Sequence, residues 1–122
     1  MRLPAAVVAI MAIMAVTSPT QAHDWYSDRH DPVFRNACCG GTDCAPLDVK
    51  FVTIEDAGFR VRMTADQGKA INPYRWTNVD ALIEWNRVQV SEDGRYHICL
   101  KPTNIPSDTH HGVWCFFAPP ST

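Results

Sequence analysis

The segment AHDWYSDRHD, at 22–31, contains the residues with the greatest potential for chemistry. It holds two histidines and three aspartates: His23, Asp24, Asp28, His30 and Asp31. If His23 is the first residue of the mature chain, its α-amine and imidazole can chelate one ion together. Nitrogen ligands in a tetragonal arrangement suit Cu(II). This pattern predicts a divalent metal site built on His23, with copper favoured before zinc.

Other histidines and acids can complete such a site. Besides His23, we take His97, His30 and Asp24 as the main candidate ligands, and the remaining possibilities are His110, His111, Asp28 and Asp31. His97 stands out because it lies two residues before Cys99 on the same face of an expected strand. The alternative is that His23 is an exposed terminal residue and that His97 is a polar strand residue with a hydrogen-bond partner.

A secretory signal peptide is what would place His23 at the N-terminus. A short basic start is followed by an uninterrupted apolar run at 5–16 and by a small residue, Ala22. Twelve helical residues cover about 18 Å, whereas the hydrocarbon core of a bilayer is about 30 Å thick, so a membrane anchor is the less favoured interpretation. The pattern predicts a signal peptide at 1–22 and a single periplasmic or secreted domain at 23–122, with no transmembrane segment in the mature chain.

The charge of the mature chain argues against nucleic acid as a partner. Removal of Arg2 with the signal leaves 10 basic against 13 acidic residues, a formal charge of −3 with neutral histidines. No basic patch of the nucleic-acid type is visible. We therefore expect a ligand or protein of the cell envelope as the partner.

Five cysteines in a chain of this length predict a disulfide scaffold. They are Cys38, Cys39, Cys44, Cys99 and Cys115. Two bonds and one leftover thiol allow fifteen arrangements, and the sequence leaves them open. Because a bond between adjacent cysteines is strained, Cys38 and Cys39 are expected to differ in partner, and one of them is the expected leftover thiol. The simplest geometry joins the CCGGTDC loop at 38–44 to the C-terminal pair, Cys99 and Cys115.

Catalysis is the less favoured class. The chain has no Gly-x-Ser-x-Gly and no His-Glu-x-x-His, and its acids stand singly in expected turns. The redox motif Cys-x-x-Cys is also absent, so a thiol-dependent enzyme ranks last. Zinc held by cysteines ranks below disulfides in an oxidising compartment. We therefore predict no catalytic residue and no organic cofactor site.

Tryptophan gives the main alternative to metal binding. The four tryptophans, Trp25, Trp76, Trp85 and Trp114, can present flat faces to a glycan or a protein. They can equally build a small core, because aromatic side chains bury the most area per residue.

Hydrophobic periodicity and turn residues predict the elements that must position these groups. We expect a hairpin from 47–54 and 59–63, a short strand at 69–76, a short helix at about 78–85, a second hairpin from 88–90 and 95–100, and a last strand at 113–118. The helix is predicted because Val79, Leu82 and Ile83 fall on one helical face at i, i+3 and i+4, after a Thr77–Asp80 pattern that resembles a capping box. The fold class expected is mainly β: a small disulfide-stabilised antiparallel domain of two hairpins, with one short helix and an irregular N-terminal arm.

The mature chain resembles a family of small secreted bacterial proteins of uncharacterised function. The resemblance covers most of 23–120 and lies in four motifs. They are His-x-Trp-Tyr (His23, Trp25, Tyr26), Cys-Cys-x-x-x-Asp-Cys (Cys38, Cys39, Asp43, Cys44), Asp-Gly-x-x-His-x-Cys (Asp93, Gly94, His97, Cys99) and Cys-x-Phe-x-Pro (Cys115, Phe117, Pro119). It implies the compartment and the extent of the domain and no mechanism.

Overall fold

The computed structural model of the chain describes residues 24–39, 43–103 and 112–120. The expected signal peptide at 1–22, the metal candidate His23 and the histidines His110 and His111 lie outside the described residues. Within the described part, no helix is both long and apolar enough to span a bilayer.

The first sheet consists of β2 (Val52–Glu55), β3 (Gly58–Met63) and β4 (Val79–Glu84), in the order β2-β3-β4. β2 and β3 form the first predicted hairpin, with Thr53 opposite Arg60. On β3, Phe59, Val61 and Met63 are buried and Arg62 is exposed, as the alternation of the sequence indicated. The expected strand begins later than predicted, because Val49–Phe51 is a 3₁₀ turn (η2) capped by Asp48.

The predicted helix at 78–85 is wrong, because this segment is β4. Val79, Ala81 and Ile83 are all buried and lie opposite β3, with Ala81 facing Val61. The two-residue period of burial therefore overrides the i, i+3, i+4 pattern from which the helix was predicted. Two of these positions are β-branched, and such side chains favour strands.

The short helix lies earlier in the chain, where a turn was expected. It is α1 (Ala65–Lys69), and it begins with a capping box. The Thr64 side chain accepts from the Gln67 N–H, and the Gln67 side chain accepts from the Thr64 N–H. The strand expected at 69–76 is also wrong, because the chain after α1 runs through turns up to β4.

The second sheet has the order β1-β6-β7-β5. Its strands are β1 (Cys44–Pro46), β6 (His97–Leu100), β7 (Val113–Ala118) and β5 (Val88–Val90). The second predicted hairpin is wrong: β5 pairs in parallel with β7, and β6 pairs antiparallel with β7 from the other side. The Asp93-Gly94 turn does not close a tight hairpin, because β5 and β6 lie on opposite sides of β7. In this turn the Asp93 carboxylate accepts from the Arg95 N–H and binds His97.

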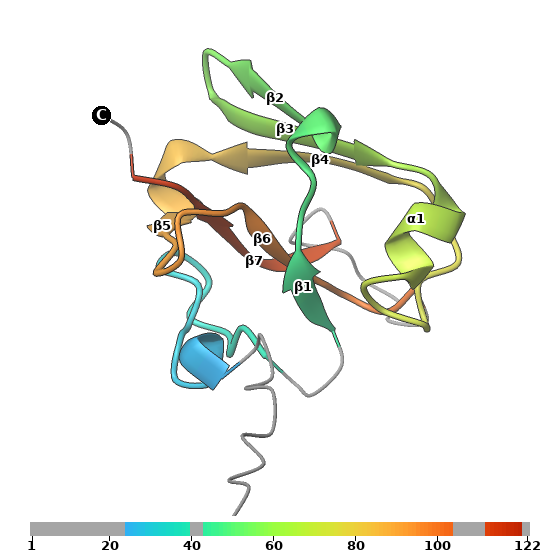
Figure 1. Cartoon of the computed structure of the whole chain (residues 1–122), viewed down its shortest axis with the longest axis horizontal. Helices are drawn as coiled ribbons and strands as arrows, with labels where there is room; N and C mark the ends of the chain where they lie inside the picture. Colours follow the sequence, from blue (N-terminus) through green and yellow to red (C-terminus); the bar gives the residue numbers. More distant parts are fainter. Residues whose placement is uncertain (1–23, 40–42, 104–111, 121–122) are drawn as a thin grey trace, which may run out of the picture.

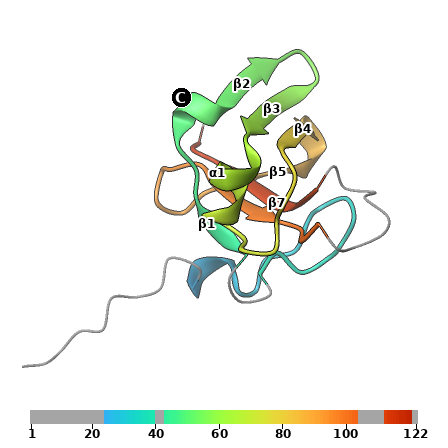
Figure 2. The same cartoon turned by 90° about the vertical axis from the view of Figure 1, so that its right-hand side faces the viewer.

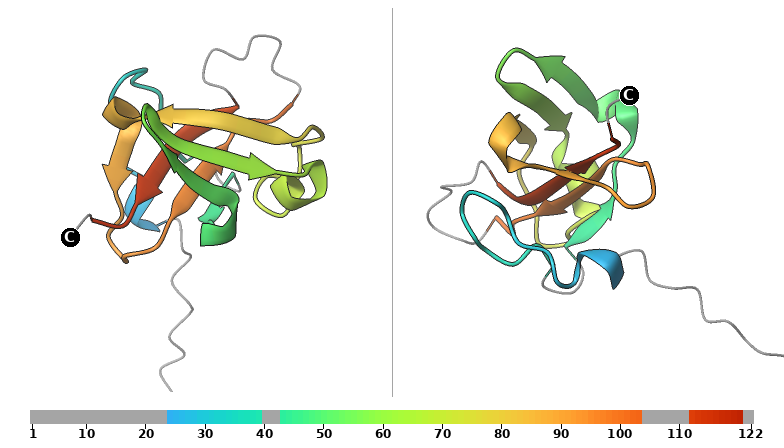
Figure 3. Two further views of the ribbon diagram at one scale, coloured as in Figure 1. Left: turned by 90° about the horizontal axis from the view of Figure 1, so that it is seen from above. Right: turned by 90° about the vertical axis from the view of Figure 1, so that its left-hand side faces the viewer.

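The domain is layered, with the second sheet in the middle. In Figures 1 and 2 the β2-β3-β4 sheet lies on one side of the second sheet and the N-terminal arm, residues 24–39, lies on the other. Figure 3 shows that the strands of the two sheets run across each other. The main core fills the space between the sheets and includes Val61, Ile83, Ile98 and Phe116.

A second cluster lies between the second sheet and the arm. It contains Tyr26, Cys38, Cys99, Cys115 and Phe117, with Trp25, Cys39, Cys44 and Trp114 packed against it. β7 therefore presents apolar side chains on both faces, and the arm covers the second face within the molecule.

Two residues of β7 depart from the alternation of an unbroken strand. A period of two would place Val113 with Cys115 and Trp114 with Phe116, but Val113 packs in the main core with Phe116 and Trp114 packs against the second cluster with Cys115. The pairing of β6 with β7 shifts between Cys99 and Leu100, and this irregularity turns Val113 to the opposite face.

The disulfides join the arm and β1 to the C-terminal strands. Cys38 is bonded to Cys115 and Cys44 to Cys99, which confirms that the 38–44 loop is attached to the C-terminal pair. Cys39 is the described cysteine outside both bonds, so the leftover thiol is one of the two expected.

Candidate functional site

The arm is fixed to the second sheet by a buried ion pair. The Asp31 carboxylate accepts from Arg87 Nε at 2.8 Å, and the two side chains are 0% and 4% exposed. Its other oxygen accepts from the backbone N–H groups of Val33 and Phe34 at 2.9 Å each. Arg87 also donates to the Val113 carbonyl. Asp31 is therefore a structural anchor of the arm and not one of the possible metal ligands that the sequence suggested.

A hydrogen-bonded chain of three side chains also joins the arm to the second sheet. The Tyr26 hydroxyl lies 3.0 Å from His97 Nδ1, and His97 Nε2 lies 2.7 and 2.8 Å from the two oxygens of Asp93. The elements that position them are the 3₁₀ turn η1 (Asp24–Tyr26), strand β6 and the turn that precedes β6. Trp25 packs edge-on against the His97 ring, with the centroids 4.9 Å apart.

The surroundings of these side chains determine which of them carry a proton. Burial, together with the charges of Asp93 and Cys39, raises the pKa of Tyr26 to about 12, so its hydroxyl stays protonated and can donate to His97. Burial raises the pKa of Asp93, but hydrogen bonds from His97 and from the Arg95 N–H outweigh it and leave the pKa below its usual value. We therefore assign the His97 proton to Nε2, where an ionised Asp93 accepts it.

An acid, a histidine and a hydroxyl in series is the arrangement that activates nucleophiles in many hydrolases. Here Tyr26 and His97 are both fully buried. A substrate has no access to the hydroxyl, so the chain of hydrogen bonds holds η1 against β6. It also satisfies two polar groups that would be costly to bury alone.

A second group of polar side chains lies at the end of the arm. One sulfur or oxygen atom each from Cys39, Asp43 and Cys44 lies within 4.8 Å of the other two, and all three residues are half-buried. It is the single cluster of three potential metal ligands within the described part of the chain. Because the Cys44 sulfur is bonded to Cys99, Cys39 and Asp43 supply the ligand atoms that an ion can use.

Within the described part of the chain, the structure does not bring the predicted metal ligands together. Both ring nitrogens of His97 have protein partners, so binding an ion would require the loss of one of these hydrogen bonds. His30 is exposed and forms an isolated bridge with Ala37. Asp24 begins η1, and its side chain lies outside the description.

The tryptophans divide between the arm and the surface. Trp25 and Trp114 are half-buried against the second sheet, whereas Trp76 is 61% and Trp85 48% exposed. The two exposed rings lie beyond opposite ends of β4 and so form no common platform.

Trp85 lines an apolar hollow of about 250 Å³. The other lining residues are Phe59, Val88, Gln89, Val90, Ala118, Pro119 and Pro120. The Trp85 ring packs edge-on against Phe59, and its Nε1 donates to the Asp56 carbonyl at 2.7 Å. These contacts hold the ring in place, although Trp85 is 48% exposed.

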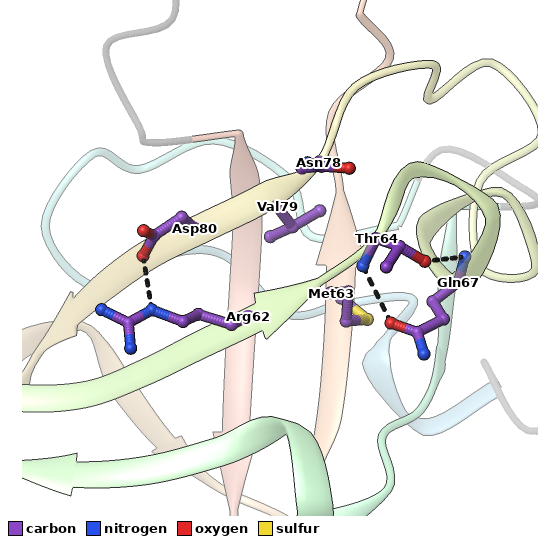
Figure 4. Close-up of a pocket in the computed structure, with 7 residues that line it drawn as sticks. All are labelled: Arg62, Met63, Thr64, Gln67, Asn78, Val79 and Asp80. Carbon is purple, nitrogen blue, oxygen red and sulfur yellow. Dashed lines mark hydrogen bonds and ion pairs between the residues drawn. The ribbon is translucent and has the colours of Figure 1, made fainter.

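A second hollow, of about 330 Å³, lies between β3, β4 and α1 (Figure 4). Its polar side chains have partners within the protein: Arg62 pairs with Asp80 at 3.5 Å, Thr64 and Gln67 form the capping box, and the Asn78 side chain accepts from the Ala65 N–H at 2.9 Å. Because each polar side chain that lines the hollow has a partner within the protein, local structure accounts for the presence of these residues there.

Three residues of the site, Tyr26, Asp93 and Asp43, stand in the motifs of the family resemblance, but the sequence assigned them no role. Asp93 and His97 are four residues apart within Asp-Gly-x-x-His, a spacing that indicates contact only if the turn between them is known. Tyr26 comes from a distant segment. Asp43 adjoins Cys44 in the sequence, and this adjacency was the available signal.

Comparison of the chain with protein-family models, with curated proteins and with solved structures finds no match.

Proposed function

We propose that this chain is an exported binding protein for a divalent metal ion, copper before zinc, and that the ion is held at the N-terminal arm by His23, Cys39 and Asp43. The observation that carries the proposal is the Cys39–Asp43 pair, whose sulfur and carboxylate atoms lie within 4.8 Å of each other on half-exposed side chains. A thiolate, a carboxylate and an imidazole are all established ligands of zinc and copper.

Chain connectivity supports the inclusion of His23. It directly precedes η1, and Trp25 of η1 packs against the same cluster as Cys39. Cleavage after Ala22 supplies the α-amine as a further nitrogen ligand, and nitrogen ligands are the reason for placing copper before zinc. His30 and Asp24 remain candidates for additional ligands.

Calorimetric titration of the mature chain, residues 23–122, with Zn²⁺ and Cu²⁺ tests this proposal. We expect one site, weakened about tenfold or more when one residue is added before His23 and when Asp43 is replaced in Asp43→Asn. Asp56→Asn is the matched control, because Asp56 is an exposed acid in the β2–β3 turn. The metal affinity of this variant should equal that of the unchanged chain.

Spectroscopy with Co²⁺, in place of zinc, reports on the thiolate. We expect a thiolate-to-cobalt charge-transfer band that disappears in Cys39→Ser. Unchanged affinity in the extended chain would remove His23 from the site, and no binding to the mature chain would end the proposal.

A second candidate is a glycan- or protein-binding module that uses exposed tryptophans. The hollow at Trp85 favours it, because a half-exposed ring with a fixed orientation lines an apolar surface together with Val90 and Pro119. Titration with panels of envelope glycans and proteins should change the tryptophan fluorescence. The change should be lost in Trp85→Phe and kept in Trp76→Phe, whose ring lies at the other end of β4. A signal that survives Trp85→Phe would count against this hollow.

A further inference from the structure

The five cysteines form one group on the face of the second sheet that the arm covers. Cys44 on β1 lies opposite Cys99 on β6, and Cys99 in turn lies opposite Cys115 on β7. Side chains at directly opposed positions point to the same side of a sheet. Cys38 joins the row through its bond to Cys115, and Cys39 follows Cys38 in the arm.

Within this row, the Cys39 thiol lies close to one end of a disulfide. Its sulfur is within 4.8 Å of the Cys44 sulfur, which is bonded to Cys99. Cys39 and Cys44 are half-exposed, and Cys44 belongs to β1, an edge strand of the sheet. Cys99 is fully buried. The attacking sulfur and the sulfur to be attacked therefore belong to partly exposed residues, and the sulfur that would leave belongs to a buried residue.

We infer that the domain is a thiol–disulfide exchange centre in which Cys39 attacks the Cys44–Cys99 bond. The Cys39 thiol gives up its proton, and its thiolate attacks the Cys44 sulfur. The Cys39–Cys44 bond forms, the Cys44–Cys99 bond breaks, and the electron pair leaves on the Cys99 sulfur, which takes up a proton. One disulfide and one thiol are present before and after, so the step needs neither an oxidant nor a reductant.

The surroundings make both pairings compatible with the fold. A protonated Cys99 behaves as a small apolar side chain and suits its position beside Cys115 and Phe117. Strand β1 keeps its backbone pairing with β6, and two further hydrogen bonds flank it, from the Leu47 N–H to the Tyr96 carbonyl and from the Leu100 N–H to the Asp43 carbonyl. The exchange therefore removes the covalent link between β1 and β6 and leaves the sheet in place.

The first experiment maps disulfides in the full mature chain, with a chelator present so that no metal occupies Cys39. The protein is held in a mildly alkaline buffer, quenched in acid, digested with pepsin in acid and analysed by mass spectrometry. We expect a peptide pair linked through Cys39 and Cys44, together with a peptide carrying Cys99 as a thiol. Both should be absent from Cys39→Ser. A map that contains only Cys44–Cys99 would overturn the inference.

The second experiment removes the leaving sulfur. In Cys99→Ser, air oxidation should join Cys39 to Cys44 and eliminate both thiols, while Cys38–Cys115 stays intact. The matched control, Cys99→Ser with Cys39→Ser, should keep the Cys44 thiol. If Cys99→Ser folds with Cys38–Cys115 intact and both thiols persist, the two sulfurs cannot bond in the folded domain and the inference is wrong. If this variant fails to fold, the map of the unchanged chain still decides the matter.

The exchange does not depend on the proposed metal site, although both use Cys39. Its experiments contain no metal and require neither His23 nor the Asp43 carboxylate. Exchange in a chain that binds no metal would refute the metal site alone, and metal binding by a chain that shows no exchange would refute the exchange alone.

Discussion

Replacement of Asp31 by asparagine should be one of the most damaging single changes to this domain. Asp31→Asn preserves the shape of the side chain, and the amide oxygen can still accept from the backbone N–H groups of Val33 and Phe34. The amide nitrogen then faces Arg87 Nε across the present 2.8 Å contact, so two donors meet. The guanidinium also loses this carboxylate at a position where it is only 4% exposed.

The magnitude follows from that burial. Removal of one partner from a buried ion pair costs about 3–5 kcal/mol of the free energy of unfolding. In a domain of about 100 residues, each kcal/mol corresponds to about 4–8 °C, so the melting temperature should fall by at least about 12 °C. The disulfides stay intact in this variant, and the effect therefore reports on the anchor alone.

A second ion pair of the arm supplies the matched control. Arg29 binds Glu92 at 2.6 Å, but these side chains are 39% and 53% exposed. Because solvent screens exposed pairs, Glu92→Gln should cost less than about 1 kcal/mol. The comparison holds the geometry of an ion pair constant and varies its burial.

Urea unfolding followed by tryptophan fluorescence measures both variants, and hydrogen exchange of the Val33 and Phe34 amides shows whether the arm opens first. Replacing Arg87 by methionine in the Asp31→Asn background should recover part of the loss, since it removes the buried charge. A loss in Asp31→Asn of under about 1 kcal/mol, equal to that of Glu92→Gln, would refute the reasoning.

Three further predictions concern the hydrogen bonds among Tyr26, His97 and Asp93 and the first residue of β3. Tyr26→Phe removes the donor to His97 and should lower the free energy of unfolding by about 1–3 kcal/mol in urea denaturation; no change would mean that the hydroxyl does not satisfy His97. Because the pKa of Asp93 is lowered in the folded state, its contribution to stability is present above the ordinary aspartate value of about 4 and is lost as the pH falls through the lowered value. Denaturation curves recorded across acidic pH should show this loss in the unchanged chain and a shallower one in Asp93→Asn, and equal slopes would contradict the assignment. Gly58→Ala places a methyl group 1.9 Å from the Ile83 carbonyl oxygen, so β3 and β4 must separate locally. The free energy of unfolding should fall by more than about 2 kcal/mol, which thermal unfolding followed by circular dichroism would detect. A melting temperature equal to that of the unchanged chain would contradict this prediction.

Local sequence patterns carried the prediction of the fold where neighbouring residues decide the outcome. The alternation of 59–63 and the turn before it were sufficient for the β2–β3 hairpin, and the apolar run at 113–118 for β7. The same local reasoning failed at 78–85, because Val79, Leu82 and Ile83 fit one helical face while Val79, Ala81 and Ile83 fit a strand. Pairing with β3 selects the strand, and this partner is remote in the sequence.

The candidate site was only partly accessible to such reasoning. Its cysteines could be recognised by type, and Cys39 was one of two candidates for the leftover thiol. The partner of His97 could not be found, since Tyr26 is 71 residues away and no periodicity relates the two segments.

The sequence by itself determined the mainly β class and indicated a disulfide scaffold, because composition, alternation and cysteine number are properties of the chain. The tertiary structure decided which sulfurs are bonded, that β5 lies parallel to β7, and that the arm covers the second face of the sheet. It also decided that Asp31 and His97 are buried with partners while Cys39 lies beside a disulfide. These outcomes depend on contacts between distant segments, and the free energy of such contacts is set by burial and by mutual geometry, which exist only after the chain has folded.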